Sequence, residues 1–156
     1  MKFSCREDVS APAEAVFDSL SDFAAFERAA LRRGARLRRL DSLRQPGAGL
    51  SWDVTFPFRG KQRQMIADLR RFERPEVIEF AGVSPNFEMT LGFTLVALSR
   101  QRTRLHAEFE IRPRSLGARL MVQSAKLGRA SLNTRYSKRI AALARDIEAR
   151  TGSQAV

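Results

Sequence analysis

The side chains that could carry acid–base or nucleophilic chemistry are scarce in this chain. It contains one histidine, His106, one cysteine, Cys5, and one tyrosine, Tyr136. A zinc site needs several histidine, cysteine or clustered carboxylate ligands, so these numbers argue against one. Neither a P-loop nor a Gly-x-Gly-x-x-Gly segment is present. We therefore predict no metal and no cofactor, and we assign no catalytic residue.

Each of the three reactive side chains has a structural interpretation. His106 alternates with Glu108 and Glu110, on the strand face opposite Leu105, which predicts that it lies outside any cavity. Cys5 lies in a strand-like segment with no histidine nearby and is interpreted as structural. Tyr136 is predicted on an inward face, where a buried phenol needs a hydrogen-bond partner. In the simpler interpretation, Tyr136 lies at the rim of the contact between helix and sheet. In the alternative, its hydroxyl binds a ligand carbonyl. As an acid, Tyr136 could also serve a cyclase.

The middle of the chain alternates apolar and polar residues with a period of two, which is typical of half-buried strands. The alternation covers residues 50–58, 65–69, 87–97 and 105–111, with a further short strand at 77–83. Turns at 59–61 and 99–102 make this an antiparallel meander. The inward-facing strand residues, together with two residues of the closing helix, are predicted to form the wall of a ligand cavity. The alternative is that they simply pack as core. These residues are Trp52, Val54, Phe56, Met65, Phe80, Met89, Leu91, Phe93, Leu105, Phe109, Leu132 and Tyr136.

Helical spacing appears at both ends of the chain. After a strand over 2–9, Ser10 is the predicted N-cap of a first short helix. Asp22 is the predicted cap of a second, which ends at Gly34 and has Phe23, Phe26, Ala30 and Leu31 as its apolar face. A long helix is predicted from Ser115 to about residue 149, with a break near Gly117 or Gly128 as the alternative. Polar side chains near its middle that could reach a ligand, or simply be solvated, are Gln123, Ser124, Ser131 and Asn133.

The chain has the length of one domain. Its 156 residues predict a single domain over 1–152 and a flexible tail over 153–156. Charges interrupt the first eight residues, so no signal-peptide apolar region is expected. No apolar run is long enough to cross a membrane, and a single cysteine excludes a disulfide within the chain. The expected location is the cytoplasm, and the oligomeric state is left open.

The positive charge is large and unevenly placed. The chain carries 28 Lys and Arg against 17 Asp and Glu, a formal net charge of +11, and 24 of the basic residues are arginine. No acidic residue lies between Arg112 and Arg145. Such a surface could attract anionic lipid headgroups or nucleic acid. Nucleic acid is the weaker choice, because aromatic residues do not interleave with the basic ones, and the arginine excess could be a compositional bias. The basic surface is Arg119, Lys126, Arg129, Arg135, Lys138 and Arg139.

The segment from Val9 to Asp22, Val-Ser-Ala-Pro-Ala-Glu-Ala-Val-Phe-Asp-Ser-Leu-Ser-Asp, resembles the opening of the START-related SRPBCC superfamily. That superfamily includes polyketide cyclase/dehydrase, coenzyme Q-binding and pollen-allergen-like proteins. The resemblance extends to the order of elements over essentially the whole chain. It implies an α+β helix-grip fold, with a curved antiparallel sheet of six to seven strands wrapped around a long C-terminal helix and two short helices after the first strand. It also implies a hydrophobic cavity, but no shared set of catalytic residues.

The expected function is therefore binding of a small hydrophobic ligand, such as a lipid, quinone or polyketide, between the sheet and the last helix. Two alternatives remain open. One is an enzyme of the cyclase or dehydratase type, working without a metal. The other is a peripheral protein that binds anionic membranes through its basic helix.

Overall fold

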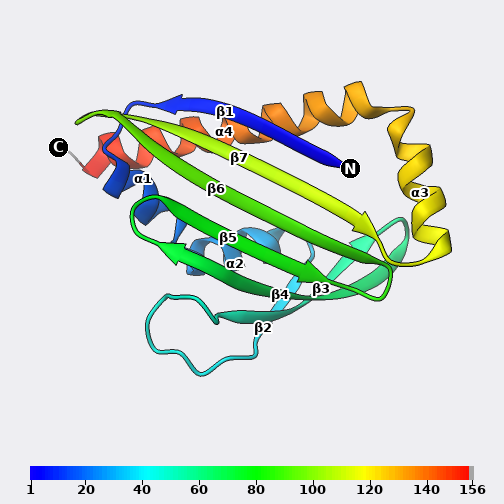
Figure 1. The fold of residues 1–156 in the computed structure, drawn as a ribbon. Coiled ribbons are helices and arrows are strands. Elements are labelled where there is room, and N and C mark those ends of the chain that lie inside the picture. Colours follow the sequence, from blue (N-terminus) through cyan, green and yellow to red (C-terminus); the bar gives the residue numbers. More distant parts are fainter. Residues whose placement is uncertain (155–156) are drawn as a thin grey trace.

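A single seven-stranded antiparallel sheet forms the frame of the molecule. The computed structural model describes residues 1–154, and its strands follow the order β1-β7-β6-β5-β4-β3-β2 (Figure 1). All neighbouring strands are antiparallel, as the short turns between the predicted strands indicate. The strands are β1 Lys2–Val9, β2 Arg36–Arg39, β3 Ser51–Phe58, β4 Lys61–Glu73, β5 Val77–Val83, β6 Phe87–Ser99 and β7 Arg102–Pro113.

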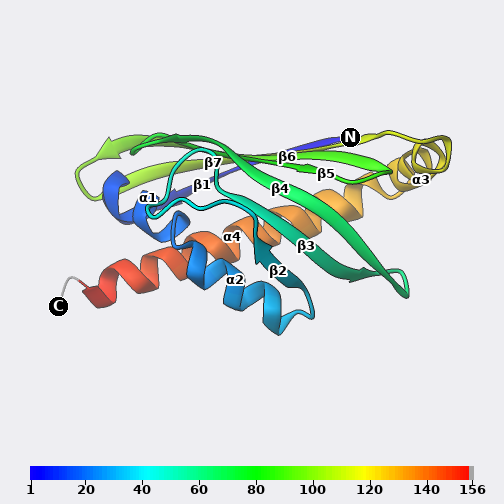
Figure 2. The same ribbon diagram turned by 90° about the horizontal axis from the view of Figure 1, so that it is seen from below.

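Three of the four helices within residues 1–154 lie on one face of this sheet. These are α1 (Ala13–Leu20), α2 (Phe23–Arg32) and the long α4 (Arg129–Gln154), all on the same side in Figure 2. The remaining helix, α3 (Leu116–Lys126), lies at the end of the sheet where β7 ends (Figure 1). The α+β helix-grip architecture predicted from the sequence is confirmed.

Local capping signals were informative, with one exception. The Asp22 carboxylate accepts a 3.1 Å hydrogen bond from the Ala25 amide at the start of α2, and the Ser115 hydroxyl accepts one of 3.1 Å from the Ala118 amide at the start of α3. The prediction that Ser10 caps α1 is wrong. Pro12 holds the N-cap position with no side-chain bond. The Ser10 amide instead donates to Glu148 Oε1 over 2.8 Å, so this turn is fastened to α4.

The hairpin between β3 and β4 turns at Arg59 and Gly60. Both have positive φ, at 51° and 74°, the pattern of a type I′ turn, whose twist matches that of the flanking strands. Glycine adopts this conformation without the steric cost that a side chain brings. The predicted turn at 59–61 is therefore present.

The predicted single helix from Ser115 to about 149 is two helices. α3 ends at Lys126, and α4 begins at Arg129. The break consists of Leu127 and Gly128, and Gly128 is one of the two glycines at which the sequence predicted a possible break. Glycine favours a helix end because it loses more backbone entropy in a helix than alanine does. Separation at this point lets α3 turn away from the direction of α4 (Figure 1).

The fully buried core joins α1 and α4 to the sheet. Phe17 of α1, Leu105 of β7 and Ile147 of α4 are at most 1% exposed and belong to one cluster of packed side chains. α4 packs mainly across β1 and also against α1. The C-terminal half of α4 therefore covers one side of the sheet and leaves the strands from β3 to β6 to be covered by something else.

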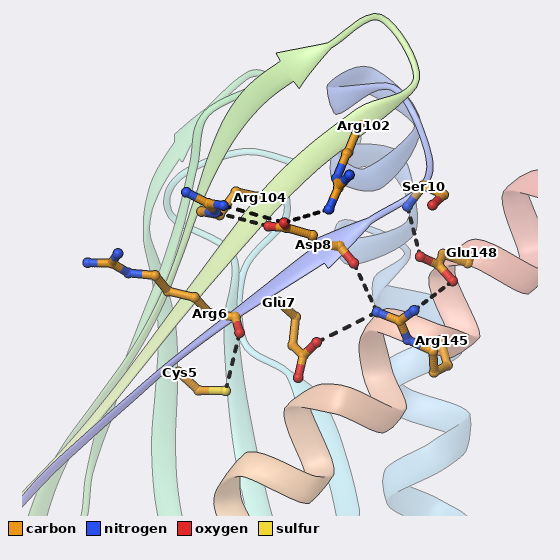
Figure 3. A network of polar contacts seen from close by, with 9 residues as sticks. All are labelled: Cys5, Arg6, Glu7, Asp8, Ser10, Arg102, Arg104, Arg145 and Glu148. Carbon is orange, nitrogen blue, oxygen red and sulfur yellow. Dashed lines mark hydrogen bonds and ion pairs between the residues drawn. The ribbon is translucent and has the colours of Figure 1, made fainter.

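A polar network fastens α4 to β1 (Figure 3). The Arg145 guanidinium donates to the Asp8 carbonyl oxygen over 2.9 Å and lies 3.6 Å from Glu7 Oε2. The Asp8 carboxylate accepts from Arg102 over 3.0 Å and from Arg104 Nε over 2.9 Å. The Arg145 contacts fasten α4 to β1, and the Asp8 carboxylate joins β1 to the start of β7.

The structure differs from the sequence-based expectation at β2 and at the C-terminal end of α4. The four-residue strand β2 is not evident in the sequence. Its only apolar residue is Leu37, so it shows no alternation of apolar and polar residues. The predicted tail starts at 153, whereas α4 continues to Gln154, and residues 155–156 lie outside the described residues.

Candidate functional site

An apolar pocket of about 360 Å³ lies between α2 and the sheet. This volume falls within the range of small-molecule sites, about 300–1,000 Å³. The wall is almost wholly apolar. It consists of Phe23, Phe26, Glu27 and Ala30 from α2, Leu37 from β2, and Trp52, Val54, Met65, Ala67, Phe80, Ala81, Gly82, Met89, Thr90, Leu91, Phe93 and Phe109 from β3 to β7.

Strand register explains why these side chains meet. Trp52 lies opposite Ala67, and Val54 lies opposite Met65, across β3 and β4. Leu91 lies opposite both Phe80 of β5 and Phe109 of β7. Directly opposed residues of antiparallel strands point to the same face, so the alternation read from the sequence becomes one continuous apolar floor.

Aromatic rings join the floor to α2. The ring of Phe23, at the start of α2, lies 5.7 Å from that of Trp52 and 6.0 Å from that of Phe80, and the last two rings are 6.3 Å apart. Centroid distances of this size are those of favourable tilted and edge-to-face aromatic pairs. Asp22 caps the helix just before Phe23, so the local start signal of α2 also positions this ring over the sheet.

Trp52 also binds α2 through a polar contact. Its indole Nε1 donates a 2.9 Å hydrogen bond to Glu27 Oε1. The Arg39 guanidinium lies 5.8 Å from the centre of the indole ring system and also pairs with Asp41. Glu27 is the only charged residue among those that line the pocket, and its acceptor oxygen satisfies an indole that is 4% exposed.

Gly82 leaves space for the side chain of Met65 in the floor of the pocket. A Cβ placed on Gly82 would come within 3.0 Å of the Met65 sulfur atom, which is closer than such contacts normally occur. The absence of a side chain at Gly82 therefore lets Met65 lie across the neighbouring strand. Methionine adapts to irregular shapes, so Met65 and Met89 give this part of the wall some capacity to adjust.

One basic side chain on the same face has no partner for its Nε. Arg63 of β4 lies opposite Phe56 and two residues from Met65, so it shares their face of the sheet. Its Nε atom is buried and has no hydrogen-bond partner among the described residues. Buried polar groups are almost always hydrogen-bonded, which makes Arg63 a donor in need of an acceptor next to the pocket.

Eight of the twelve predicted wall residues line this pocket, and four lie elsewhere. The eight are Trp52, Val54, Met65, Phe80, Met89, Leu91, Phe93 and Phe109. Phe56 packs half-buried against the core, and Leu105 is fully buried in it. Leu132 and Tyr136 belong to α4, from which no described residue lines the pocket. The reason is that α4 packs across β1, whereas α2 stands over the middle of the sheet.

Tyr136 is held by the sheet instead. Its hydroxyl donates a 2.6 Å hydrogen bond to the backbone oxygen of Ala107, and its ring lies 5.8 Å from that of Phe3. Burial raises the pKa of the phenol to about 12, with smaller contributions from Cys5 and Glu108. A phenol with this pKa and a backbone partner is a poor proton donor. The simpler interpretation, a tyrosine at the helix–sheet contact, agrees with this geometry.

The α2 wall is what sequence reasoning missed. The sequence shows the apolar face formed by Phe23, Phe26 and Ala30 as a helical pattern, but it does not show that this face closes a pocket. Its signal was the three apolar residues at helical spacing directly after the Asp22 cap. The polar candidates Gln123, Ser124, Ser131 and Asn133 are all exposed.

The opposite face of the sheet is charged. A cleft of about 320 Å³ there is lined by Lys2, Arg70, Glu79, Glu88, Thr90, Glu108, Glu110 and Arg112. His106 lies near this face, 3.9 Å from Glu108, as its alternation predicts. Cys5 is half-buried, and burial raises the pKa of its thiol. Within residues 1–154, no cluster of three His, Cys, Asp or Glu side chains has the arrangement of a metal site.

The six residues of the basic surface are all exposed. Arg129 donates to the Lys2 carbonyl oxygen over 3.0 Å and lies 5.7 Å from the Phe3 ring, so it also helps to fasten β1. The other five, Arg119, Lys126, Arg135, Lys138 and Arg139, form no ion pair with any described carboxylate.

Comparison with solved structures places this architecture among known folds. The Zhui aromatase/cyclase from Streptomyces sp. R1128 is 17% identical, with 96% of this chain and 94% of that chain covered and a TM-score of 0.66. A START superfamily protein from Mycobacterium smegmatis is 15% identical, with 89% and 98% covered and a TM-score of 0.55. Ara h 8.0201 is 10% identical, with 98% of each chain covered and a TM-score of 0.59. No protein-family model matches the chain. No curated protein matches it either.

These likenesses establish the fold. At 10–17% identity, proteins share an architecture without sharing a function. The chain therefore shares the helix-grip fold of these structures, as the resemblance of the Val9–Asp22 segment implies. None of the helices within residues 1–154 is both long and apolar enough to cross a membrane.

Proposed function

We propose that the protein binds a small hydrophobic ligand, as a carrier or a sensor, in the pocket between α2 and the sheet. The observation that carries the proposal is the pocket itself, about 360 Å³ with Glu27 as its only charged lining residue. An open apolar pocket costs stability, because its lining loses packing contacts. A chain that buries Phe17, Leu105 and Ile147 almost completely, yet leaves this space between Phe23, Trp52 and Phe80, has a volume suited to a guest.

The polar groups near the pocket favour a guest with one oxygen-bearing end. The buried Arg63 Nε has no acceptor within residues 1–154, and a carbonyl, carboxylate or phosphate oxygen would supply one. Glu27 is already engaged by Trp52. An apolar body with a single oxygen-rich end describes a fatty acid or a quinone with an apolar tail. A polyketide, which carries oxygens along its chain, fits this description less well.

Cyclase or dehydratase chemistry is the weaker candidate. It requires polar or titratable groups that point into the pocket, and the candidates in the sequence are Tyr136, Asn133 and Gln123. Tyr136 donates to a backbone oxygen, and Asn133 and Gln123 are exposed. The Zhui aromatase/cyclase shares the fold at 17% identity, which transfers no activity. Binding without chemistry therefore accounts better for the site.

Native mass spectrometry of the purified protein tests the proposal. We expect a bound small molecule to be released on collisional activation and to partition into organic solvent. The matched control is Ala67→Phe, which fills the pocket. A wild-type protein that carries no guest, and takes up none from a mixture of fatty acids and quinones, would overturn the proposal.

A further inference from the structure

Helix α3 is apolar on two opposite sides. One side is buried through Ala118, which is 3% exposed, and Val122, which is 8% exposed. On the other side lie Leu116, Leu120 and Leu127, which are 75%, 62% and 92% exposed. Successive residues of a helix are about 100° apart, so the three leucines fall within about 40° of one another. They form one stripe that no described part of the chain covers.

The surroundings of this stripe are basic. Arg119 and Lys126 flank the leucines on α3, and neither pairs with a described carboxylate. The sequence has no acidic residue from Arg112 to Arg145. Two copies of this face brought together would therefore repel each other, which disfavours a symmetric dimer. An apolar stripe with a basic border matches an anionic lipid surface, where leucines enter the acyl boundary and cations meet the headgroups.

The same end of the molecule has a second feature of this kind. The β3–β4 turn lies at the end where α3 lies in both views (Figures 1 and 2). It carries Phe58, which is 45% exposed, next to Arg59 and Lys61. The Arg59 guanidinium lies 5.5 Å from the Phe58 ring. Two separate segments at one end of the protein thus combine exposed apolar and basic side chains.

The start of α3 is tied to a turn next to the pocket. The Ser115 hydroxyl lies 3.0 Å from Asn86 Oδ1, and Arg114 donates to the Ser84 carbonyl oxygen over 2.6 Å. Ser84 and Asn86 belong to the turn between β5 and β6. That turn closes the strand ends on which the pocket residues Gly82 and Met89 lie. The start of α3 and the strand ends that carry these two pocket residues are therefore joined through the β5–β6 turn.

We propose that α3 is an interfacial helix that docks this end of the protein on an anionic lipid bilayer, with Leu116, Leu120 and Leu127 inserted. Docking itself is independent of the pocket. The consequence that a guest passes between the pocket and the bilayer rests on the function proposed above.

The test is co-sedimentation with vesicles of phosphatidylcholine, with and without roughly a quarter of phosphatidylglycerol. Wild-type protein is expected to bind the anionic vesicles and to be released by salt. The triple variant Leu116→Ser, Leu120→Ser, Leu127→Ser should bind at least about tenfold more weakly. Val96→Ser is the matched control, because Val96 is 52% exposed near the β6–β7 turn, at the opposite end of β7 from α3, and should change nothing. Arg119→Gln with Lys126→Gln should weaken the dependence on phosphatidylglycerol, while Arg59 and Lys61 at the same end retain part of it.

Three results would overturn the proposal. One is the absence of wild-type binding to anionic vesicles, and another is unchanged binding by the triple leucine variant. The third is a dimer, detected by analytical ultracentrifugation, that the triple variant dissociates, since the stripe would then belong to a second copy. The triple variant should still take up a hydrophobic guest in native mass spectrometry, and Ala67→Phe should still bind vesicles. Failure of docking and failure of the proposed function are thereby separate outcomes.

Discussion

The indole of Trp52 and the carboxylate of Glu27 join the sheet to α2 through one 2.9 Å hydrogen bond at the wall of the pocket. α2 is a helix of ten residues, and helices of this length are marginal by themselves in water. Its place over the sheet therefore depends on tertiary contacts such as this bond and the Phe23 ring. The pocket exists because these contacts hold a short helix over β3 to β6, while the long helix lies over β1.

Replacing Glu27 by alanine should loosen α2. The substitution leaves the Trp52 indole N–H without an acceptor in a site that is 4% exposed, and such a loss costs about 1–3 kcal/mol. Urea unfolding should show that decrease in the free energy of unfolding. Trp52 is the only tryptophan, so its emission should also shift to longer wavelength. Glu27→Gln keeps an acceptor oxygen and should lose less; equal losses in the two variants would contradict the role given to this bond.

Filling the pocket should separate binding from stability. Ala67 lines the pocket, whereas its neighbour Ile66 points to the opposite face and is 37% exposed. Ala67→Phe should reduce binding of a hydrophobic guest at least about tenfold, because the ring occupies its space, with a change in stability within about 1–3 kcal/mol. Ile66→Phe places the same ring on the other face and should leave binding intact. Isothermal titration calorimetry of both variants measures this, and loss of binding in Ile66→Phe alone would contradict the placement of the site.

Tyr136 should titrate late and act structurally. The folded state raises its pKa from 10.0 to about 12. Between pH 10 and pH 12, the unfolded chain therefore binds fewer protons at this residue than the folded chain does. The stabilising contribution is present below pH 10 and is lost as the pH rises through that window. As the only tyrosine, Tyr136 can be followed by tyrosinate absorbance, which should appear with a midpoint near 12 in folded protein.

The variant Tyr136→Phe isolates that effect. It should remove the tyrosine's part of the stability loss between pH 10 and 12. At neutral pH it should cost about 0.5–1.5 kcal/mol, the net worth of a typical hydrogen bond. Guest binding should stay unchanged, because Tyr136 does not line the pocket. A large loss of guest binding in this variant would show that α4 contributes to the site.

Asp8 makes the stability of the fold decrease as the pH falls, whereas Tyr136 makes it decrease as the pH rises. Its hydrogen bonds to Arg104, and then to Arg102, hold the pKa of the carboxyl below its ordinary 3.8. The stabilisation is present above about 3.8 and is lost as the pH falls through the lower folded-state value. Thermal melts from pH 5 downwards should therefore be flatter for Asp8→Asn than for wild type. Asp146→Asn, on the exposed surface of α4, serves as the control, and identical slopes in wild type and Asp8→Asn would contradict the assignment.

The sequence predicted what depends on local pattern. The alternation from Leu50 to Phe58 and from Phe87 to Ala97 identified the strands and the face on which eight pocket residues lie. Asp22 and Ser115 marked the starts of two helices correctly, because capping is a contact within three residues. The prediction at Ser10 fails because α1 begins at Ala13 and Pro12 holds the N-cap position. The Ser10 amide donates to Glu148, 138 positions away, a contact that local pattern cannot show.

The parts that could not be predicted depend on which helix covers which strands. The spacing of Leu132, Tyr136 and Ile140 shows an apolar face, but not that this face meets β1 and the core. Phe23 and Phe26 show another apolar face, but not that it closes the pocket. The exposed stripe of Leu116, Leu120 and Leu127 likewise looks like a core face in the sequence, because periodicity cannot distinguish a buried side from an exposed one.

Trp52 allows the central claim, a hydrophobic guest held between α2 and the sheet, to be measured directly. Bromine atoms quench tryptophan emission only at short range, and Trp52 is both the sole tryptophan and part of the pocket wall. Titration with a medium-chain fatty acid brominated along its chain should quench Trp52 saturably, whereas the unbrominated acid should not. Ala67→Phe should abolish the quenching. Saturable binding of the brominated acid in calorimetry without quenching of Trp52 would place the guest elsewhere and contradict the account.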